Sequence, residues 1–346
     1  MSRVTILMPV YNAARHLARC VESVLTQTFS DFQLLVIDDA STDNTWAMLK
    51  HTTDSRLRIE RNPANLGVAA TLNRGIELTQ TEFLARLDAD DLCRPQRLAL
   101  QVRHLEAHPR VGIVGTYVKE FGDMPWPVLT RYPLGAADTK AGLLFGNTLC
   151  HPVVMMRMAM IREHALRYDP VYSRAEDYDL WIRAARCFDL DNVPYVGLAK
   201  RTHKGSVTAQ HRDTMRAQSA ALSKGLLREI GIEAASQELA LHARLGAGER
   251  LTGWEELDRA EQWLKTLASR SSSSGCYEPE AMRRAVGTVW WRACLNSTPL
   301  GPRIWKRAHR SPLAKAGIPT PLRRAIFGAS IAWHTARRGR RQGAES

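Results

Sequence analysis

The chain has 346 residues, of which 45% are hydrophobic and 24% are charged, a composition that excludes a disordered protein. Its net charge of +13 is concentrated at the C-terminus, because residues 301–346 carry 11 basic residues and one acidic residue, whereas the other 300 residues carry 37 and 34. No apolar run approaches the roughly 20 residues of a membrane-spanning helix. The N-terminus also lacks the pattern of a signal peptide, so we expect a cytoplasmic protein.

The first 90 residues predict strands that alternate with helices. Nearly continuous apolar runs, typical of strands buried on both faces of a parallel sheet, lie at 4–11 and 32–39. Apolar residues at helical spacing predict helices at 13–27, 41–50 and 68–78, and shorter apolar runs predict strands at 57–61 and 82–87. This alternation is typical of βαβ units, in which helices cover a parallel sheet.

Beyond Pro95 the pattern predicts more of the same sheet and then a helical region. We expect helices from Pro95 to Ala107 and at 175–188, and strands at 111–121, 151–157 and 193–203. Long helices follow from about 211 to 270, "SSSSG" at 271–275 is interpreted as a linker or loop, and a further helix carries two tryptophans. We therefore expect an α/β domain over 1–210, a helical extension over 211–300, and a basic tail over 301–346 that is partly disordered or associates with membrane.

Three predicted strands end in polar residues that suit a ligand. They are followed by Tyr11-Asn12, Asp38-Asp39 and the run Asp88-Ala-Asp90-Asp91. In an open α/β sheet the carboxyl ends of parallel strands form the ligand-binding edge. The carboxylates of Asp88 and Asp90 are two residues apart on extended chain and point the same way, so they repel unless a cation joins them. This pattern predicts a divalent metal, but an acidic turn in which Asp91 or Asp90 caps the helix after Pro95 explains it as well.

Four segments resemble the nucleotide-sugar-binding half of family 2 glycosyltransferases, which have the GT-A fold. They are "ILMPVYNAARHLARCVESVLTQTF", "LLVIDDASTDNT", "NLGVAATLNRGI" and "FLARLDADD", and the resemblance extends over about residues 4–208. It implies that Pro9, Tyr11 and Asp39 line the nucleobase pocket. It also implies that Asp88 lies beside ribose and metal, and that Asp90 is the principal ligand of Mn²⁺ or Mg²⁺.

The resemblance implies weaker roles for two more residues of this half. Arg86 would face the nucleotide, although it could equally be a partner for nearby carboxylates. Asn65 would touch the edge of the base, although a role in its turn is an equal alternative.

Two downstream blocks also match the family. "AEDYDLWIR" resembles the block that holds the catalytic base, which by position is Asp177; alternatively, Glu176 and Asp177 only place negative charge in the first turn of a helix. "KRTHKGSVT" resembles a block in which His203 would reach the metal or diphosphate, and Arg201 and Ser206 the phosphates. Lys200 stands where the family usually has Tyr.

The resemblance implies a metal-dependent, inverting transferase. It would move a sugar from a nucleoside diphosphate, with UDP as the expected nucleotide, to a hydroxyl of a glycan or lipid-linked acceptor in surface-polysaccharide synthesis. The Q-x-x-R-W block of processive synthases is absent, so we expect one sugar per encounter, and the 211–300 region would complete the acceptor side or form an oligomer surface.

The sequence also bears on two other classes of protein, an oxidoreductase and a binding protein. No complete G-x-G-x-x-G follows the first strand, which argues against a dinucleotide-dependent oxidoreductase. The remaining alternative is a basic nucleic-acid- or membrane-binding protein on a GT-A-like body without transferase activity. Of the tail's two targets, we expect an anionic membrane surface at the inner face of the plasma membrane and no nucleic acid.

Overall fold

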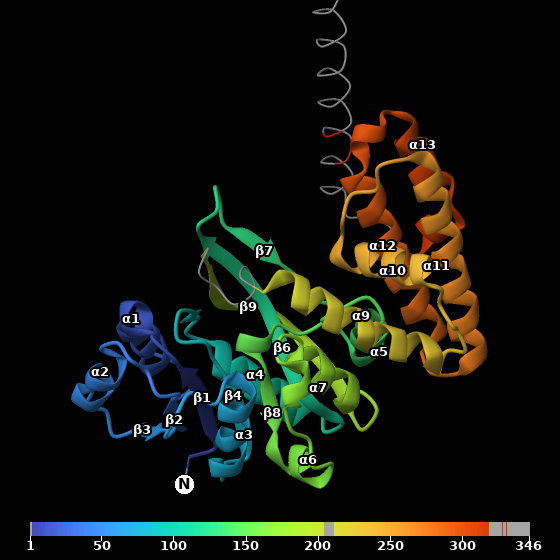
Figure 1. Cartoon of the computed structure of the whole chain (residues 1–346). Helices are drawn as coiled ribbons and strands as arrows, with labels where there is room; N and C mark the ends of the chain where they lie inside the picture. Colours follow the sequence, from blue (N-terminus) through green and yellow to red (C-terminus); the bar gives the residue numbers. More distant parts are fainter. Residues whose placement is uncertain (1, 204–210, 318–326, 328–329, 331–346) are drawn as a thin grey trace, which may run out of the picture. The chain divides into compact units, whose positions relative to one another are not determined.

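The computed structural model describes residues 2–203 and 211–317, together with 327 and 330. The chain divides into two compact units, the first Met1–Leu143 with Asn147–Gln218, the second Leu144–Gly146 with Ser219–Ser346. The first unit is an α/β unit and the second is helical (Figure 1). Among the described residues, no helix combines the length and the apolar character that crossing a membrane requires.

The first unit is built on one mixed sheet. Its path is β3-β2-β1-β4-β8-β6-β9-β5, with β7 paired to β6 off this path. The N-terminal strands are parallel, whereas β8 runs antiparallel to β4 and β6, and β5 runs antiparallel to β9. The strands are β1 Val4–Val10, β2 Phe32–Asp38, β3 Leu57–Arg61, β4 Phe83–Arg86, β5 Leu92–Cys93, β6 Val111–Gly122, β7 Val128–Thr130, β8 Met155–Arg157 and β9 Asp189–Thr202.

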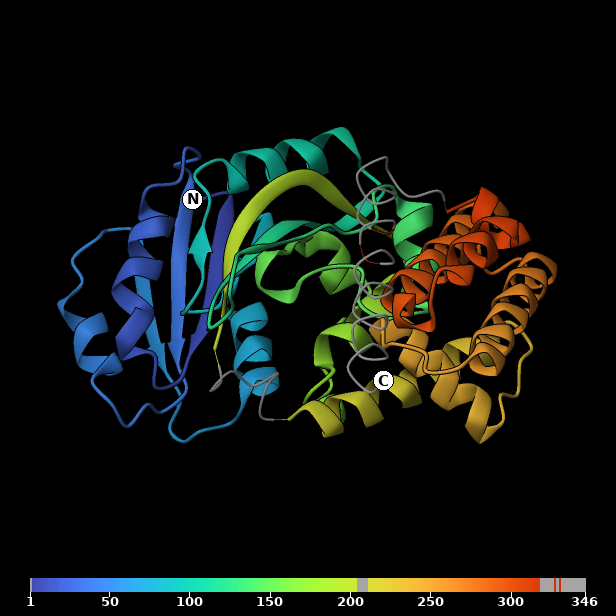
Figure 2. The ribbon, with the colours of Figure 1, turned by 90° about the horizontal axis from the view of Figure 1, so that it is seen from above.

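Helices cover both faces of this sheet (Figure 2). Alternate residues of β1 join a buried core with apolar residues of α1 and α4, while Leu7, on the other face, touches α3 at Gly75, where a Cβ would collide with the leucine. These strands read as continuous apolar runs because both of their faces are buried. The helices of this unit are α1 Ala14–Leu25, α2 Thr45–His51, α3 Val68–Leu78, α4 Arg97–Ala107, α5 Ala136–Leu143, α6 Met158–Glu163 and α7 Glu176–Ala184.

The second unit packs helices around buried leucines and tryptophans. Trp290 is fully buried, and its indole N–H donates to the carbonyl of Ala308. The prediction of a linker or loop at 271–275 is wrong, because α11 continues through Ser274 and ends at Gly275 in the left-handed conformation. The helices are α9 Arg212–Glu229, which begins in the first unit, α10 Ser236–Ala247, α11 Trp254–Ser274, α12 Pro279–Asn296 and α13 Arg303–Arg310.

The α/β fold class expected from the sequence is confirmed. The parallel half of the sheet consists of the strands that the apolar runs predicted, and their carboxyl ends lie along one edge. That edge carries the candidate site.

Candidate functional site

An acidic cluster follows β4 at the carboxyl edge of the sheet. Asp88, Asp90 and Asp91 each offer an oxygen, and these oxygens all lie within 4.8 Å of one another. Asp88 and Asp90 are partly exposed, whereas the side chain of Asp91 is buried. Three carboxylates this close repel one another, which makes the cluster a candidate site for a cation.

Asp91 is the member whose role differs from the prediction. It does not cap the next helix, since α4 begins at Arg97 and its N-cap, Gln96, makes no side-chain hydrogen bond. Instead, Oδ1 of Asp91 accepts a 2.6 Å hydrogen bond from the backbone N–H of Arg201, and its buried Oδ2 has no hydrogen-bond partner. Burial and the charges of Asp88 and Asp90 raise the pKa of Asp91 well above its usual value.

Arg86 lies beneath the cluster and balances part of its charge. Its Nη2 is 2.6 Å from Oδ1 of Asp88, and the residue is only 5% exposed. Burial opposes its charge, but the charge and hydrogen bond of Asp88 together with the charges of nearby acidic groups outweigh burial, so that the pKa of Arg86 is raised. Its Nε and Nη1 have no hydrogen-bond partner, although both are buried. Lys200 adds a second positive charge that acts on Asp91 and Asp88, so that these cations balance only part of the repulsion among the three carboxylates.

The end of β9 approaches the cluster from the side. His203 places Nε2 3.2 Å from Oδ2 of Asp90, and Arg201 donates from Nε to the carbonyl of Asp90 at 3.1 Å. The pairing of β5 with β9 holds these segments together. The pKa of Asp90 is raised by burial and by the charge of Asp88. Ser206, predicted to contact phosphate, lies outside the described residues.

These residues fit a divalent cation. Carboxylate oxygens with an imidazole nitrogen suit Mn²⁺, and the carboxylates suit Mg²⁺. The buried Oδ2 of Asp91 has no hydrogen-bond donor. Repulsion among the carboxylates adds to burial in raising the pKa values of Asp90 and Asp91, so a bound cation would stabilise the charged cluster.

The predicted nucleobase residues lie at the ends of β1 and β2. Asp39 donates its N–H to the carbonyl of Val10, which brings it beside Tyr11. The buried carboxylate of Asp39 accepts from the Asn62 side chain at 2.7 Å and from the N–H groups of Leu66 and Gly67, both at 2.9 Å. Asp39 therefore fixes the loop before α3, in addition to any contact with a base.

The other members of this group are more open. Tyr11 is 50% exposed, and Asn65 is exposed in the loop that Asp39 holds. Pro9 lies near the end of β1 opposite Ile37 of β2. Ala40, the residue after Asp39, has φ +59°, a conformation that costs energy for a residue other than glycine and that clusters at functional sites.

Asp177 begins a second group of carboxyls, on α7. Its Oδ2 accepts a 2.9 Å hydrogen bond from the side chain of Asn147, and Oδ1 accepts from the N–H of Tyr178. Burial raises its pKa. Burial and the charge of Asp177 raise the pKa of neighbouring Glu176 to about 7. The favourable field at a helix start therefore does not dominate here, because it would lower these values.

Arg86 links the two groups of carboxyls electrostatically. Its charge lowers the pKa values of Glu176 and Asp177, although burial outweighs it at both. Next to them, Nε2 of His151 lies 2.9 Å from the hydroxyl of Tyr168, and burial keeps the pKa of His151 well below its usual value. The sequence did not single out Tyr168, because it lies outside the recognisable blocks.

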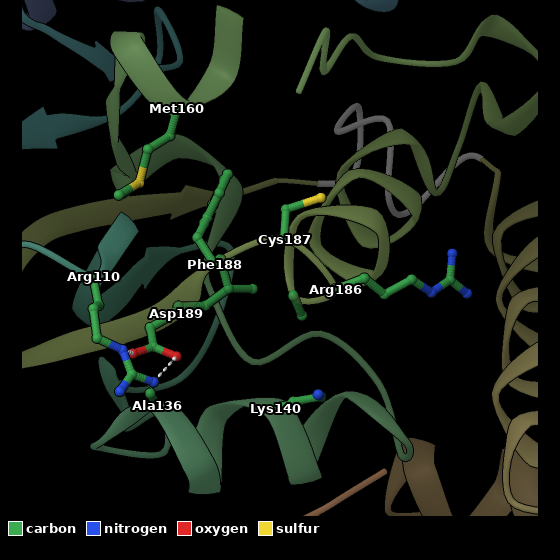
Figure 3. A pocket seen from close by; sticks show the side chains of 10 residues that line it. Arg110, Ala136, Lys140, Met160, Arg186, Cys187, Phe188 and Asp189 are labelled. Carbon is green, nitrogen blue, oxygen red and sulfur yellow. Dashed lines mark hydrogen bonds and ion pairs between the residues drawn. The ribbon is translucent and has the colours of Figure 1, made fainter. Parts of the chain in front are cut away.

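A cavity of about 320 Å³ lies at the opposite edge of the sheet (Figure 3). Its lining includes Arg110 and Asp189, which pair at 3.1 Å immediately before β6 and at the start of β9. Since these strands run parallel to β4, this cavity faces the amino ends and is separate from the acidic cluster.

Comparison with known proteins assigns a family to the N-terminal part of the chain. Residues 5–165 match Glycosyl transferase family 2. An uncharacterized glycosyltransferase of Haemophilus influenzae is 31% identical over 211 residues, which are 58% of this chain and 65% of that protein. Residues 5–165 therefore carry a glycosyltransferase family 2 domain. The matched part of the chain spans slightly less than two thirds of the length of the Haemophilus relative.

Two further relatives cover more of the chain. The Escherichia coli protein described as UDP-Glc:alpha-D-GlcNAc-diphosphoundecaprenol beta-1,3-glucosyltransferase WfaP is 27% identical over 68% of this chain and 89% of its own. Succinoglycan biosynthesis protein ExoO of Rhizobium meliloti is 25% identical over 90% of this chain and 94% of its own.

Solved structures share the fold. S. aureus TarS 1–349, in complex with UDP-GlcNAc, superposes with a TM-score of 0.53 at 16% identity and covers 99% of this chain and 92% of that one. Mannosyltransferase PcManGT from Pyrobaculum calidifontis, in complex with GDP-Man and Mn²⁺, gives 0.52 at 18% identity over 91% and 85%. The fold of this chain is accordingly GT-A.

Proposed function

We propose that this chain is a metal-dependent, inverting and non-processive glycosyltransferase. It moves a sugar from a UDP-linked donor to a hydroxyl of a glycan or lipid-linked acceptor in surface-polysaccharide synthesis. The observation that carries this proposal is the three-carboxylate cluster at the carboxyl edge of a family 2 domain, with a buried oxygen that no donor satisfies. A UDP donor and a lipid-linked acceptor are supported by the description of WfaP, and a metal by the Mn²⁺ complex of PcManGT.

In this proposal the chain binds the donor along the sheet edge. Asp88, Asp90 and His203 hold Mn²⁺ or Mg²⁺, which when bound neutralises the charge that develops on the leaving diphosphate. Arg201 and Ser206 bind phosphate oxygens, and Arg86 faces the nucleotide. Pro9, Tyr11, Asp39 and Asn65 line the pocket for the base.

Asp177 is the base that removes the proton of the acceptor hydroxyl. With a pKa of about 7, Glu176 keeps its proton below neutral pH, which limits the negative charge beside Asp177. The hydrogen bond from Asn147 fixes the direction of the Asp177 carboxylate. Its own raised pKa brings the base closer to the working pH.

Two substitutions test these assignments. Asp90→Asn should abolish the Mn²⁺-dependent increase in UDP affinity measured by calorimetry, together with transfer. Asp177→Asn should keep UDP binding and lose transfer by a factor on the order of 10² or more. Asp31→Asn, at an exposed position before β2, is the matched control. Unchanged metal-dependent binding in Asp90→Asn, or loss of UDP binding in Asp177→Asn, would contradict the respective role.

The basic tail is proposed to hold the enzyme at the inner face of the plasma membrane. Most of residues 301–346 lie outside the described part, but α13 buries Ile304 and Ala308 and exposes Arg303, Lys306 and Arg310. Deleting 318–346 should weaken binding to vesicles that contain phosphatidylglycerol. Steep salt-dependent binding to RNA, without binding to vesicles, would favour the nucleic-acid alternative.

A further inference from the structure

The hairpin of β6 and β7 carries exposed apolar side chains on the catalytic unit. Trp126 is 75% exposed in the connection, and Val128 and Leu129 of β7 are 47% and 43% exposed. Figure 1 shows this hairpin projecting away from the rest of its unit. Clustered apolar side chains of this size usually mark an interaction surface, and tryptophan is enriched where proteins meet the headgroup region of a bilayer.

A cavity of about 500 Å³ adjoins the hairpin, and Pro127 belongs to both. The register places Lys119 opposite Leu129, so these two side chains share a face of the hairpin, and Phe121 is on the same face of β6. The apolar part of the lining includes Leu92, Phe121, Pro127 and Ala199. The cavity therefore has an apolar wall that continues onto the hairpin.

The charged residues of the lining are predominantly cationic. They include Arg19, Arg94 and Lys119, with Glu22 as the acidic member, for a net charge of +2. All three cations are exposed, and across residues 2–203 and 211–317 none has an acidic side chain within ion-pair distance. Their charge is available to an external anion.

We propose that the catalytic unit docks on an anionic bilayer through this hairpin and cavity. Trp126 and Leu129 enter the headgroup region, and a phospholipid phosphate lies among Arg94, Lys119 and Arg19, with its apolar part against the cavity wall. Cations beside an apolar wall favour an amphiphilic anion, because a soluble phosphate would make no contact with the apolar wall or with the exposed tryptophan. This surface is separate from the basic tail.

Docking at this surface has a consequence for the acidic cluster. Leu92, which lines the cavity, directly follows Asp91 in the chain. A bilayer held there lies beside the loop that carries the cluster, where a membrane-anchored acceptor would be presented. The docking itself does not depend on transferase activity.

The test is flotation of the full-length protein with vesicles of phosphatidylcholine alone, or of phosphatidylcholine with about one third phosphatidylglycerol. Arg94→Gln with Lys119→Gln should weaken binding to the anionic vesicles by about 25-fold, since each cation near such a surface contributes about fivefold. Trp126→Ser should weaken it by about tenfold. The matched controls are Lys50→Gln with Arg103→Gln, and Val171→Ser, which is 74% exposed on the same unit.

Several outcomes would overturn the proposal. Cavity and hairpin variants that bind as tightly as their controls would show that the tail or another face holds the vesicle. Equal loss of binding to neutral and anionic vesicles in the double cation variant would remove the role of the anionic surface charge, because phosphatidylcholine carries a phosphate but no net charge. Hydrolysis of UDP-sugars in solution is measured in parallel; its absence in the wild type would count against the proposed function and leave the vesicle result intact.

Discussion

Replacing Glu176 with glutamine tests how far burial raises the pKa of a carboxyl in the second group. Burial, with the charge of Asp177, raises the pKa of Glu176 from 4.5 to about 7. Arg86 opposes this shift, Asp88 adds to it, and Nδ1 of His151 lies 4.0 Å from Oε1. The folded protein therefore keeps the proton to a higher pH than the unfolded chain does.

The sign and size of the pH effect follow from proton linkage. Between pH 4.5 and about 7 the unfolded chain binds fewer protons at this site, so the folded state loses stability as the pH rises. The stability that the protonated Glu176 contributes is fully present below pH 4.5. It is lost once the pH exceeds the pKa of the folded state, which is about 7. From pH 5 to pH 8 the loss amounts to about 2–3 kcal/mol, since each pH unit between the two pKa values corresponds to about 1.4 kcal/mol.

Glutamine has no proton to lose and avoids this penalty. The melting temperature of Glu176→Gln should therefore exceed that of the wild type by about 5–10 °C more at pH 8 than at pH 5. Differential scanning fluorimetry at both pH values measures it, with Glu163→Gln, at an exposed position on α6, as the control. A difference between variant and wild type that stays constant with pH, or that shrinks toward pH 8, would refute the burial argument.

Two further substitutions test the scaffold around the site. Asp39→Asn should lower stability by about 1–3 kcal/mol and weaken UDP binding, because one of the acceptor oxygens that hold the loop before α3 is lost; calorimetry with UDP and thermal denaturation measure both, and unchanged values would show that the loop is held by other means. Gly75→Ala should destabilise the protein by about 1–3 kcal/mol through its collision with Leu7, whereas Gly225→Ala, in open space on α9, should be neutral or slightly stabilising. Equal melting temperatures for these two alanine variants would contradict the close packing of α3 on β1.

The strands and the position of the acidic cluster could be predicted because their signals are local. A strand buried on both faces has to be apolar along its length, as β1 and β2 are, and its end can be located where polar residues begin. The family blocks added the GT-A fold, which the comparisons confirm. The ligand roles of Tyr11, Asp90 and Asp177 remain predictions.

The serine run shows where local propensity failed. Serine competes with the helix for hydrogen bonds and is typical of loops, so four in a row predicted a linker or loop. In the structure α11 continues through them, and Ser271 is fully buried. Tertiary packing of the helix outweighs a difference in propensity of a few tenths of a kcal/mol per residue.

Asp91 could not be assigned because its partner is distant in sequence. An aspartate that precedes a proline and the start of a helix is typical of an N-cap, and the neighbouring residues indicated no other role for Asp91. The pairing of β5 with β9 brings the N–H of Arg201, 110 residues away, to Oδ1 and leaves Oδ2 buried without a donor. Because the carboxylate is fixed by that backbone contact, it cannot turn away from Asp88 and Asp90. The cluster therefore has three carboxylates where the spacing of the sequence predicted two, and this crowding of negative charge is a property of the tertiary structure.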